Sequence, residues 1–196
     1  MSLPAHKHRM SFAEYLIWEA DMPDRWEFID SEPFMMAGGS DVHNTIAGNA
    51  YMALRERLRG SPCSVFMSDV KLRDDANECA FFPDVFVSCA ASDRARRLDK
   101  AAPALIVEVL SPSTEAYDRG KKFAAYRRFD ELKALILLAQ DEPYAECYVR
   151  AEGGGWLLTE ASGLEARIEV APLALELALA DLYRDLPAAT EPPPDA

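Results

Sequence analysis

The spacing of hydrophobic and polar residues predicts four helices. Helices are expected over residues 11–20, 41–60, 119–129 and 179–183. The first is amphipathic with Ser11 as its N-cap, because a serine before an apolar-periodic segment is a typical helix start. The second carries apolar side chains at helical spacing, with Asp41 as the expected cap and Gly60 as the stop.

Strands account for most of the remaining hydrophobic segments. Residues 25–38 alternate and then turn, which predicts a hairpin. Further strands are expected over 63–73, 80–89, 105–110, 134–140, 145–151 and 155–161. The resulting order is helix, hairpin, helix, strands, helix, strands. It predicts an α/β (α+β) fold with a mixed β-sheet flanked by helices.

The length of 196 residues suits one domain with a sizeable core. We expect that domain over residues 1–186, followed by a flexible, proline-rich acidic tail over 187–196. The chain has no apolar run long enough to span a membrane and no segment typical of a secretory signal at its start. These features predict a cytoplasmic protein without a membrane partner.

The four cysteines, Cys63, Cys79, Cys89 and Cys147, are widely scattered and form no C-x-x-C pair. This pattern favours free thiols in a reducing cytoplasm over a zinc site or a disulfide framework.

The net charge of −12 argues against indiscriminate binding to nucleic acid. Basic residues are nevertheless concentrated in two segments, 94–100 and 118–128. A basic segment is usually a solvated face, so these two permit an anionic partner without establishing one.

Glu108 stands within "LIVEVL", a segment that otherwise reads as a strand buried on both faces. Strand alternation places Glu108 on the same side as Ile106 and Leu110. An isolated carboxylate there would be costly without a positive partner. Two interpretations follow: an edge strand whose glutamate reaches water, or a cation or catalytic lysine on that face.

Asp84 and Lys122 are candidates to complete such a site. Asp84 enters another apolar strand just after a proline, and two carboxylates on neighbouring strands would suit a hard divalent cation. Lys122 shares a predicted helical face with Asp118 and Tyr126, which suggests that this face packs inward. The alternative is an ordinary surface ion pair between Asp118 and Lys122.

Three segments carry a resemblance to a known family: "RWEFIDSEPFMMAGGSDVHN", "PDVFVSC" and "LIVEVLSPSTEAYDRGKKFAAYR". They resemble the Uma-type restriction-endonuclease family, which belongs to the PD-(D/E)XK nuclease superfamily. This family was long described as a bacterial domain of unknown function. The resemblance extends over about residues 10–185 and implies a restriction-endonuclease-like fold. One departure is Ser31, which stands where the family usually has a glycine in the hairpin turn.

The resemblance also implies roles for individual residues. Asp84 and Glu108 match catalytic acids that bind a divalent metal, Mg²⁺ or Mn²⁺, together with the backbone carbonyl of Val109. Lys122 matches a catalytic lysine that has moved to the next helix, because Leu110 stands at its more common position. Supporting positions are Glu27, which often completes the metal shell, and His43 and Asp118.

A metal-dependent endonuclease that hydrolyses phosphodiester bonds of DNA is therefore the expected function, and cutting both strands of a duplex favours a homodimer. The phosphates are expected to meet a basic patch that borders the metal site and consists of Arg94, Arg96, Arg97 and Arg119. Two alternatives stay open: a catalytically weak or inactive nuclease-fold module that binds DNA or a protein, and a metal-dependent hydrolase acting on a small molecule.

Overall fold

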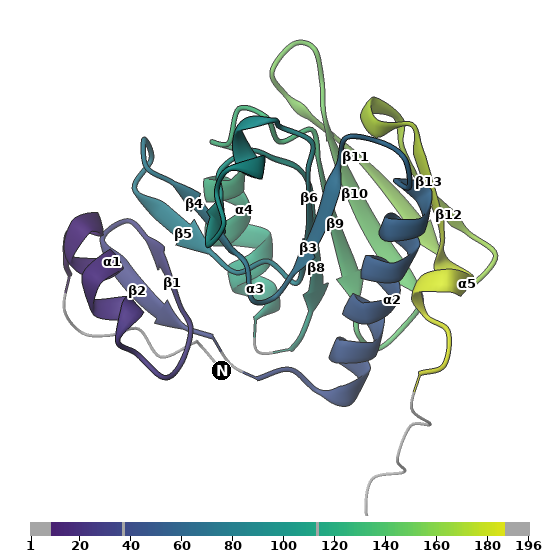
Figure 1. Cartoon of the computed structure of the whole chain (residues 1–196). Coiled ribbons are helices and arrows are strands. Elements are labelled where there is room, and N and C mark those ends of the chain that lie inside the picture. The colour runs from purple at the N-terminus through teal and green to yellow at the C-terminus, as the bar shows by residue number, and fades with distance from the viewer. Residues whose placement is uncertain (1–8, 37, 113, 187–196) are drawn as a thin grey trace, which may run out of the picture.

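The computed structural model describes residues 9–36, 38–112 and 114–186, and its largest element is a mixed six-stranded sheet (Figure 1). Its strands, in spatial order, are β11 (Trp156–Ser162), β10 (Tyr144–Arg150), β9 (Ala134–Ala139), β8 (Pro103–Leu110), β6 (Val85–Ser88) and β3 (Ser64–Met67). Strands β8 and β9 are parallel, whereas the other neighbouring pairs are antiparallel. The predicted α/β architecture with a mixed sheet is confirmed.

Two smaller sheets accompany it. One consists of β2 (Glu32–Met35), β1 (Trp26–Ile29), β5 (Cys79–Phe81), β4 (Lys71–Asp74) and β7 (Asp99–Lys100), and the other of β12 (Arg167–Val170) and β13 (Leu175–Ala178). The predicted strands 63–73 and 80–89 are each divided between two sheets. Ser68 adopts a positive φ between β3 and β4, and Pro83, which lacks an N–H, separates β5 from β6.

The helices lie at the expected places in the chain. They are α1 (Phe12–Ala20), α2 (Asp41–Arg57), α3 (Glu115–Tyr117), α4 (Phe123–Tyr126) and α5 (Leu179–Leu182), with short segments η1 (Ser92–Arg94), η2 (Asp118–Lys122) and η3 (Ala171–Leu173). Ser11 caps α1 as predicted, through a capping box with Glu14. The prediction that Asp41 is the N-cap of α2 was wrong. The preceding Ser40 has the extended backbone of an N-cap, and its hydroxyl accepts the N–H of His43.

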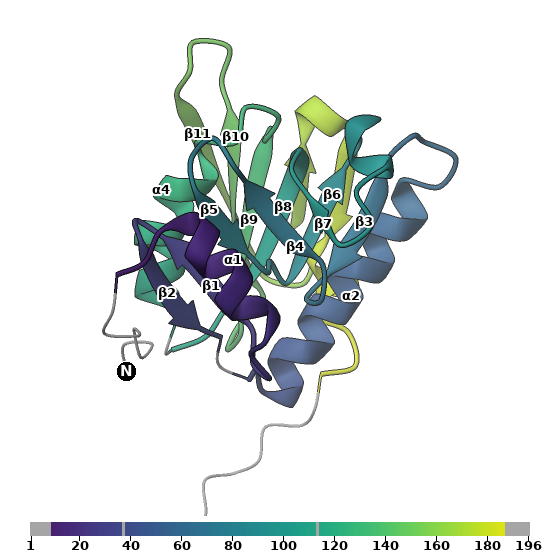
Figure 2. The same ribbon diagram turned by 60° about the vertical axis from the view of Figure 1, so that its left-hand side comes forward.

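Alternation along the central strands creates two apolar layers, one on each face of the six-stranded sheet. Val107 and its neighbours pack beneath α2 and α5. Ile106 and its neighbours pack against α4 and β5. Figures 1 and 2 show α2 on the opposite side of this sheet from α3 and α4. Glu108 shares the face of Ile106, on a strand between β9 and β6, and is buried. The edge-strand interpretation of Glu108 was therefore wrong.

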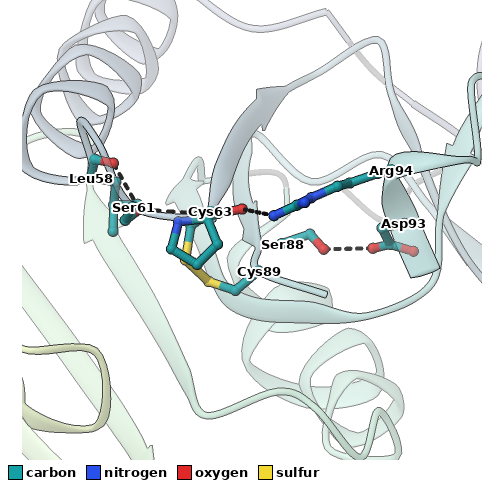
Figure 3. The surroundings of a disulfide bond; sticks show 8 residues. Leu58, Ser61, Cys63, Ser88, Cys89, Asp93 and Arg94 are labelled. Carbon is teal, nitrogen blue, oxygen red and sulfur yellow. Dashed lines mark hydrogen bonds between the residues drawn. A yellow bond between two sulfur atoms is a disulfide. The ribbon is translucent and has the colours of Figure 1, made fainter. Parts of the chain in front are cut away.

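Cys63 and Cys89 form a disulfide (Figure 3), so the prediction of four free thiols was wrong for this pair. Cys63 precedes β3 and Cys89 follows β6, and the antiparallel register that pairs Ser64 with Ser88 brings the cysteines together. Sequence spacing could not reveal this register. Cys79 and Cys147 are free and buried. The prediction that free thiols indicate a reducing compartment therefore does not apply to Cys63 and Cys89. Within the described residues, no helix has the length and apolarity needed to cross a bilayer.

The turn between β1 and β2 yields a prediction about stability. Asp30 and Ser31 both have positive φ, 51° and 67°, between the paired residues Ile29 and Glu32. Because a left-handed conformation costs a side-chain-bearing residue about 1 kcal/mol, Ser31→Gly should raise the melting temperature by about 2–4 °C. Ser162→Gly in β11 is the matched control and should not raise it. Equal or lower stability of the Ser31 variant would show that the turn is not strained.

Candidate active site

A cavity of about 230 Å³ opens beside the ends of β6 and β8. Its lining includes the predicted site residues Glu27, His43, Asp84, Glu108, Val109, Asp118 and Lys122. These residues come from β1, α2, the start of β6, β8 and η2, which are far apart in sequence. The fold thus gathers the seven positions in one place.

Strand pairing brings Asp84 and Glu108 together. Strands β6 and β8 are antiparallel, with Val85 opposite Val107, so Asp84 and Glu108 are the next positions along the two strands. The Asp84 N–H donates to Glu108 Oε2 at 3.3 Å, and the Val109 N–H donates to Asp84 Oδ2 at 2.8 Å. Each acid is therefore positioned by the backbone of the strand that carries the other.

His43 reaches Asp84 from the first turn of α2, with Nε2 at 3.0 Å from Oδ1. Burial alone would lower the pKa of His43, but the hydrogen bond and the charge of Asp84 raise it above its usual value. Burial would raise the pKa of Asp84, yet His43, Lys122 and the Val109 N–H together hold it below its usual range. Gly39 makes room for this imidazole, since a Cβ there would lie 2.7 Å from His43 Cδ2.

Lys122 lies at the centre of the cluster. Its side chain is only 6 % exposed, and its Nζ lies 2.9 Å from Glu108 Oε1, 3.0 Å from Glu27 Oε1 and 3.7 Å from Asp118 Oδ1. The alternative of a surface ion pair was wrong. Burial opposes the charge of Lys122, but Glu108 and Glu27 outweigh it and raise its pKa well above the usual value. Lys122 is therefore a protonated ammonium at neutral pH.

Two tyrosines complete the network. The Tyr126 hydroxyl donates to Glu108 Oε1 at 2.5 Å, and the Tyr117 hydroxyl donates to Glu27 Oε2 at 3.2 Å. Sequence reasoning missed both roles. The position of Tyr126, four residues after Lys122, was the available signal, but it predicted inward packing and not a hydrogen bond to Glu108. Gln140, directly after β9, also lines the cavity and was missed.

Carboxyl groups outnumber cationic groups in the cavity. Four carboxylates, those of Glu27, Asp84, Glu108 and Asp118, surround the single ammonium of Lys122, with His43 beside Asp84. Burial and the neighbouring carboxylates raise the pKa of Glu108 well above its usual value despite Lys122, and burial likewise raises the pKa of Asp118.

Hard oxygen ligands that outnumber the neighbouring cationic groups fit a divalent cation such as Mg²⁺. Asp84, Glu108 and the backbone carbonyl of Val109 are the groups that could hold it. As the described residues stand, no three His, Cys, Asp or Glu side chains form a ready metal site. Glu27 is held apart from Glu108 by the Lys122 ammonium that lies between them.

Three of the four arginines predicted to border the site lie elsewhere, and the fourth, Arg119, is already held in ion pairs. Arg94, Arg96 and Arg97 line a different cavity, near the start of β8, and Arg119 forms ion pairs with Glu115 at 2.9 Å and with Glu146. Because Glu108 is five residues beyond the first residue of β8, a rise of about 3.3 Å per residue puts it about 16 Å from that end. The arginines that precede β8 in sequence are therefore far from the Glu108 carboxylate on that strand.

Comparisons with known proteins agree with this fold. Residues 12–181 match the family model described as "Uma2: Putative restriction endonuclease". Two uncharacterized proteins of Synechocystis sp. (strain ATCC 27184 / PCC 6803 / Kazusa) are each 33% identical to this chain. The protein slr1290 matches over 91% of this chain and 93% of its own length, and sll1609 over 82% and 92%.

A solved structure from Anabaena variabilis, described as "a putative nuclease belonging to DUF820", superposes with a TM-score of 0.71. The superposition covers 89% of this chain and 97% of that one, at 17% identity. This likeness shows a shared fold.

The buried ammonium yields a prediction with a matched control. Lys122→Met should lower the free energy of unfolding by about 3–5 kcal/mol, because it leaves Glu27 and Glu108 buried without a counter-charge. Lys121→Met removes the neighbouring lysine, which is one-third exposed and pairs with Glu32, and should cost less than about 1 kcal/mol. Urea denaturation measures both, and similar losses would contradict a central role for Lys122.

Proposed function

Because the chain belongs to the Uma2 family of restriction-endonuclease-like proteins, we propose that it is a divalent-metal-dependent endonuclease that hydrolyses phosphodiester bonds of DNA. The observation that carries the proposal is the convergence of Asp84, Glu108 and Lys122 on one cavity. Two acids from adjacent strands can hold a divalent cation, and that cation together with a buried lysine would neutralise and orient a phosphate.

Asp84 and Glu108 would hold Mg²⁺ or Mn²⁺ with the Val109 carbonyl, and Glu27 lies nearby to support them. A divalent cation in this place supplies Lewis-acid polarisation of the phosphate and acidifies a water molecule. Asp84 suits this role because its carboxylate stays ionised and is fixed by His43 and by the Val109 N–H. Glu108 is less readily ionised, so its full charge would develop when an additional cation enters the cavity.

Lys122 would act through its positive charge. Its raised pKa makes it unsuited to accept a proton from water at neutral pH, whereas an ammonium can stabilise the negative charge that builds on the phosphate. Asp118 and Glu27 hold the ammonium from two sides, and Tyr126 fixes the Glu108 oxygen that it contacts. In this proposal Lys122 contributes positive charge and orients the phosphate. The water molecule that attacks the phosphate would lose its proton to an acceptor other than Lys122.

DNA is the proposed substrate because the family description names restriction endonucleases. A two-fold dimer would give each strand of a duplex its own site. The net charge of −12 means that binding must be local and sensitive to salt.

A second candidate function is a catalytically weak or inactive module of the same fold that binds DNA or a protein. One observation favours it: the Lys122 ammonium already occupies the space between Glu27 and Glu108, and the described residues hold no preformed group of three metal ligands. If Lys122 serves only as a structural counter-ion, the cluster would stabilise the fold without cleaving a substrate.

Cleavage of supercoiled plasmid separates the two candidates. The wild-type protein with Mg²⁺ should nick or linearise the plasmid, and removal of the metal with EDTA should stop the reaction. Asp84→Asn should lower the rate by about 100-fold or more, the scale on which the loss of one electrostatic contact with the transition state acts. Asp130→Asn changes the same charge at an exposed position and should leave the rate unchanged.

Cleavage that survives both EDTA and Asp84→Asn would contradict the proposed nuclease. An absence of cleavage by the wild-type protein, with plasmid still bound, would favour the inactive binding module.

A further inference from the structure

We propose that a second cavity, at the other end of β6 and β8, is a binding site for a phosphate group. This loop cavity lies between the segment that leads into β3 and the loop that joins β6 to β8. Its volume is about 320 Å³, and four cationic side chains line it: Arg94, Arg96, Arg97 and Lys100. The proposal goes beyond the nuclease function, because it concerns a separate site and requires neither a metal ion nor cleavage.

Lys100 provides the strongest indication of an anionic ligand. Its residue is only 6% exposed, and its ammonium donates to the Arg96 carbonyl and lies 5.0 Å from the centre of the Phe66 ring. Within the described part of the chain, no carboxylate oxygen lies within 4.0 Å of this ammonium to form an ion pair. A buried cation without an anion is costly, so a ligand that brings negative charge into the cavity would be favoured.

Asp93 is the carboxylate in the lining of the loop cavity, and its oxygens are already used. They accept hydrogen bonds from the Ser88 hydroxyl at 2.6 Å and from the N–H groups of Ala101 at 2.9 Å and Ala102 at 3.1 Å. Figure 3 shows Asp93 turned toward Ser88. Asp93 therefore ties both ends of the loop together, and its carboxylate makes no ion pair with Lys100.

The arginines retain donors for a ligand. Arg94 uses one nitrogen on the Pro62 carbonyl at 3.4 Å, and Arg96 uses Nε on Asp99 at 2.6 Å. Arg97 has no ion-pair partner within the described residues. A guanidinium carries five N–H donors in a planar fork, which matches two phosphate oxygens. The three arginines therefore offer a ligand several N–H donors in fixed directions as well as positive charge.

The disulfide holds two walls of the loop cavity in place. Pro62 and Ser64, on either side of Cys63, line one wall, and Ser88 and Ala90, on either side of Cys89, line the other. Figure 3 shows Arg94 extending toward the segment that carries Cys63, where it donates to the Pro62 carbonyl. A cross-linked frame reduces the ordering needed when a ligand binds.

Phosphate is the favoured anion because its oxygens can accept from several of these donors at once, and charge-assisted bonds to arginine are among the stronger hydrogen bonds. The group could belong to a small phosphorylated molecule or to the backbone of a nucleic acid. Both sources share the chemistry that the loop cavity recognises, and they differ in the length of the ligand.

Calorimetric titration of the full chain without divalent metal tests the proposal with two probes, inorganic phosphate and a short single-stranded DNA. Arg97→Gln and Lys100→Gln should each weaken binding of the effective probe by about tenfold, the scale of one charge-assisted hydrogen bond. Lys133→Gln removes an exposed charge outside the loop cavity and is the matched control. If Lys100→Gln does not fold, the exposed position Arg97 carries the test.

Each result has a definite meaning. Binding of inorganic phosphate that both variants weaken supports a site for a small phosphorylated ligand. Binding of the oligonucleotide alone, weakened by the variants and steeply dependent on salt, supports a site for nucleic-acid phosphates. The proposal is overturned if neither probe binds, or if Lys133→Gln weakens binding as much as Arg97→Gln.

Discussion

The ammonium of Lys122 permits three carboxylates to lie in an otherwise apolar layer. Glu108 stands on a central strand, Glu27 on the neighbouring hairpin and Asp118 one helical turn before Lys122, and all three face the same nitrogen. Without that nitrogen each acid would lose the positive charge that offsets its removal from water. The helix over Glu115–Tyr126 must therefore dock on this face of the sheet, since it carries the charge that the strands require.

The segment that carries Lys122 is π-helical, over Asp118–Lys122. A π-turn is uncommon and often accompanies a functional site, because it redirects the side chains of one helical turn. Here it lies between the short helices α3 and α4. Lys122 points into the cluster, while Lys121 turns outward to Glu32 on the β1–β2 hairpin. The difference in stability between the Met variants at these two positions follows from this divergence.

Much of the site could be predicted because its signals are local. One acid in an apolar strand requires a cation, and strand alternation tells which face must supply it. Spacing made Lys122 a candidate, and the resemblance to the Uma-type family implied its role and those of Glu27 and His43. The missed features depend on geometry that spacing does not contain. The Cys63–Cys89 disulfide depends on the register of β3 and β6, and the place of Arg96 depends on the direction of β8. The hydrogen bond of Tyr126 depends on close docking of the helix on β8.

The central proposal is that the cavity binds a divalent cation, because its four carboxyl groups outnumber the cationic groups that Lys122 and His43 can supply. Calorimetric titration with Mn²⁺, with no substrate present, tests it most directly. The account predicts a single ion per chain, with affinity weakened at least about tenfold by Glu108→Gln, because the amide carries no negative charge and has one oxygen where the carboxylate has two. An absence of saturable binding, or equal affinity in the Glu108→Gln protein, would contradict it.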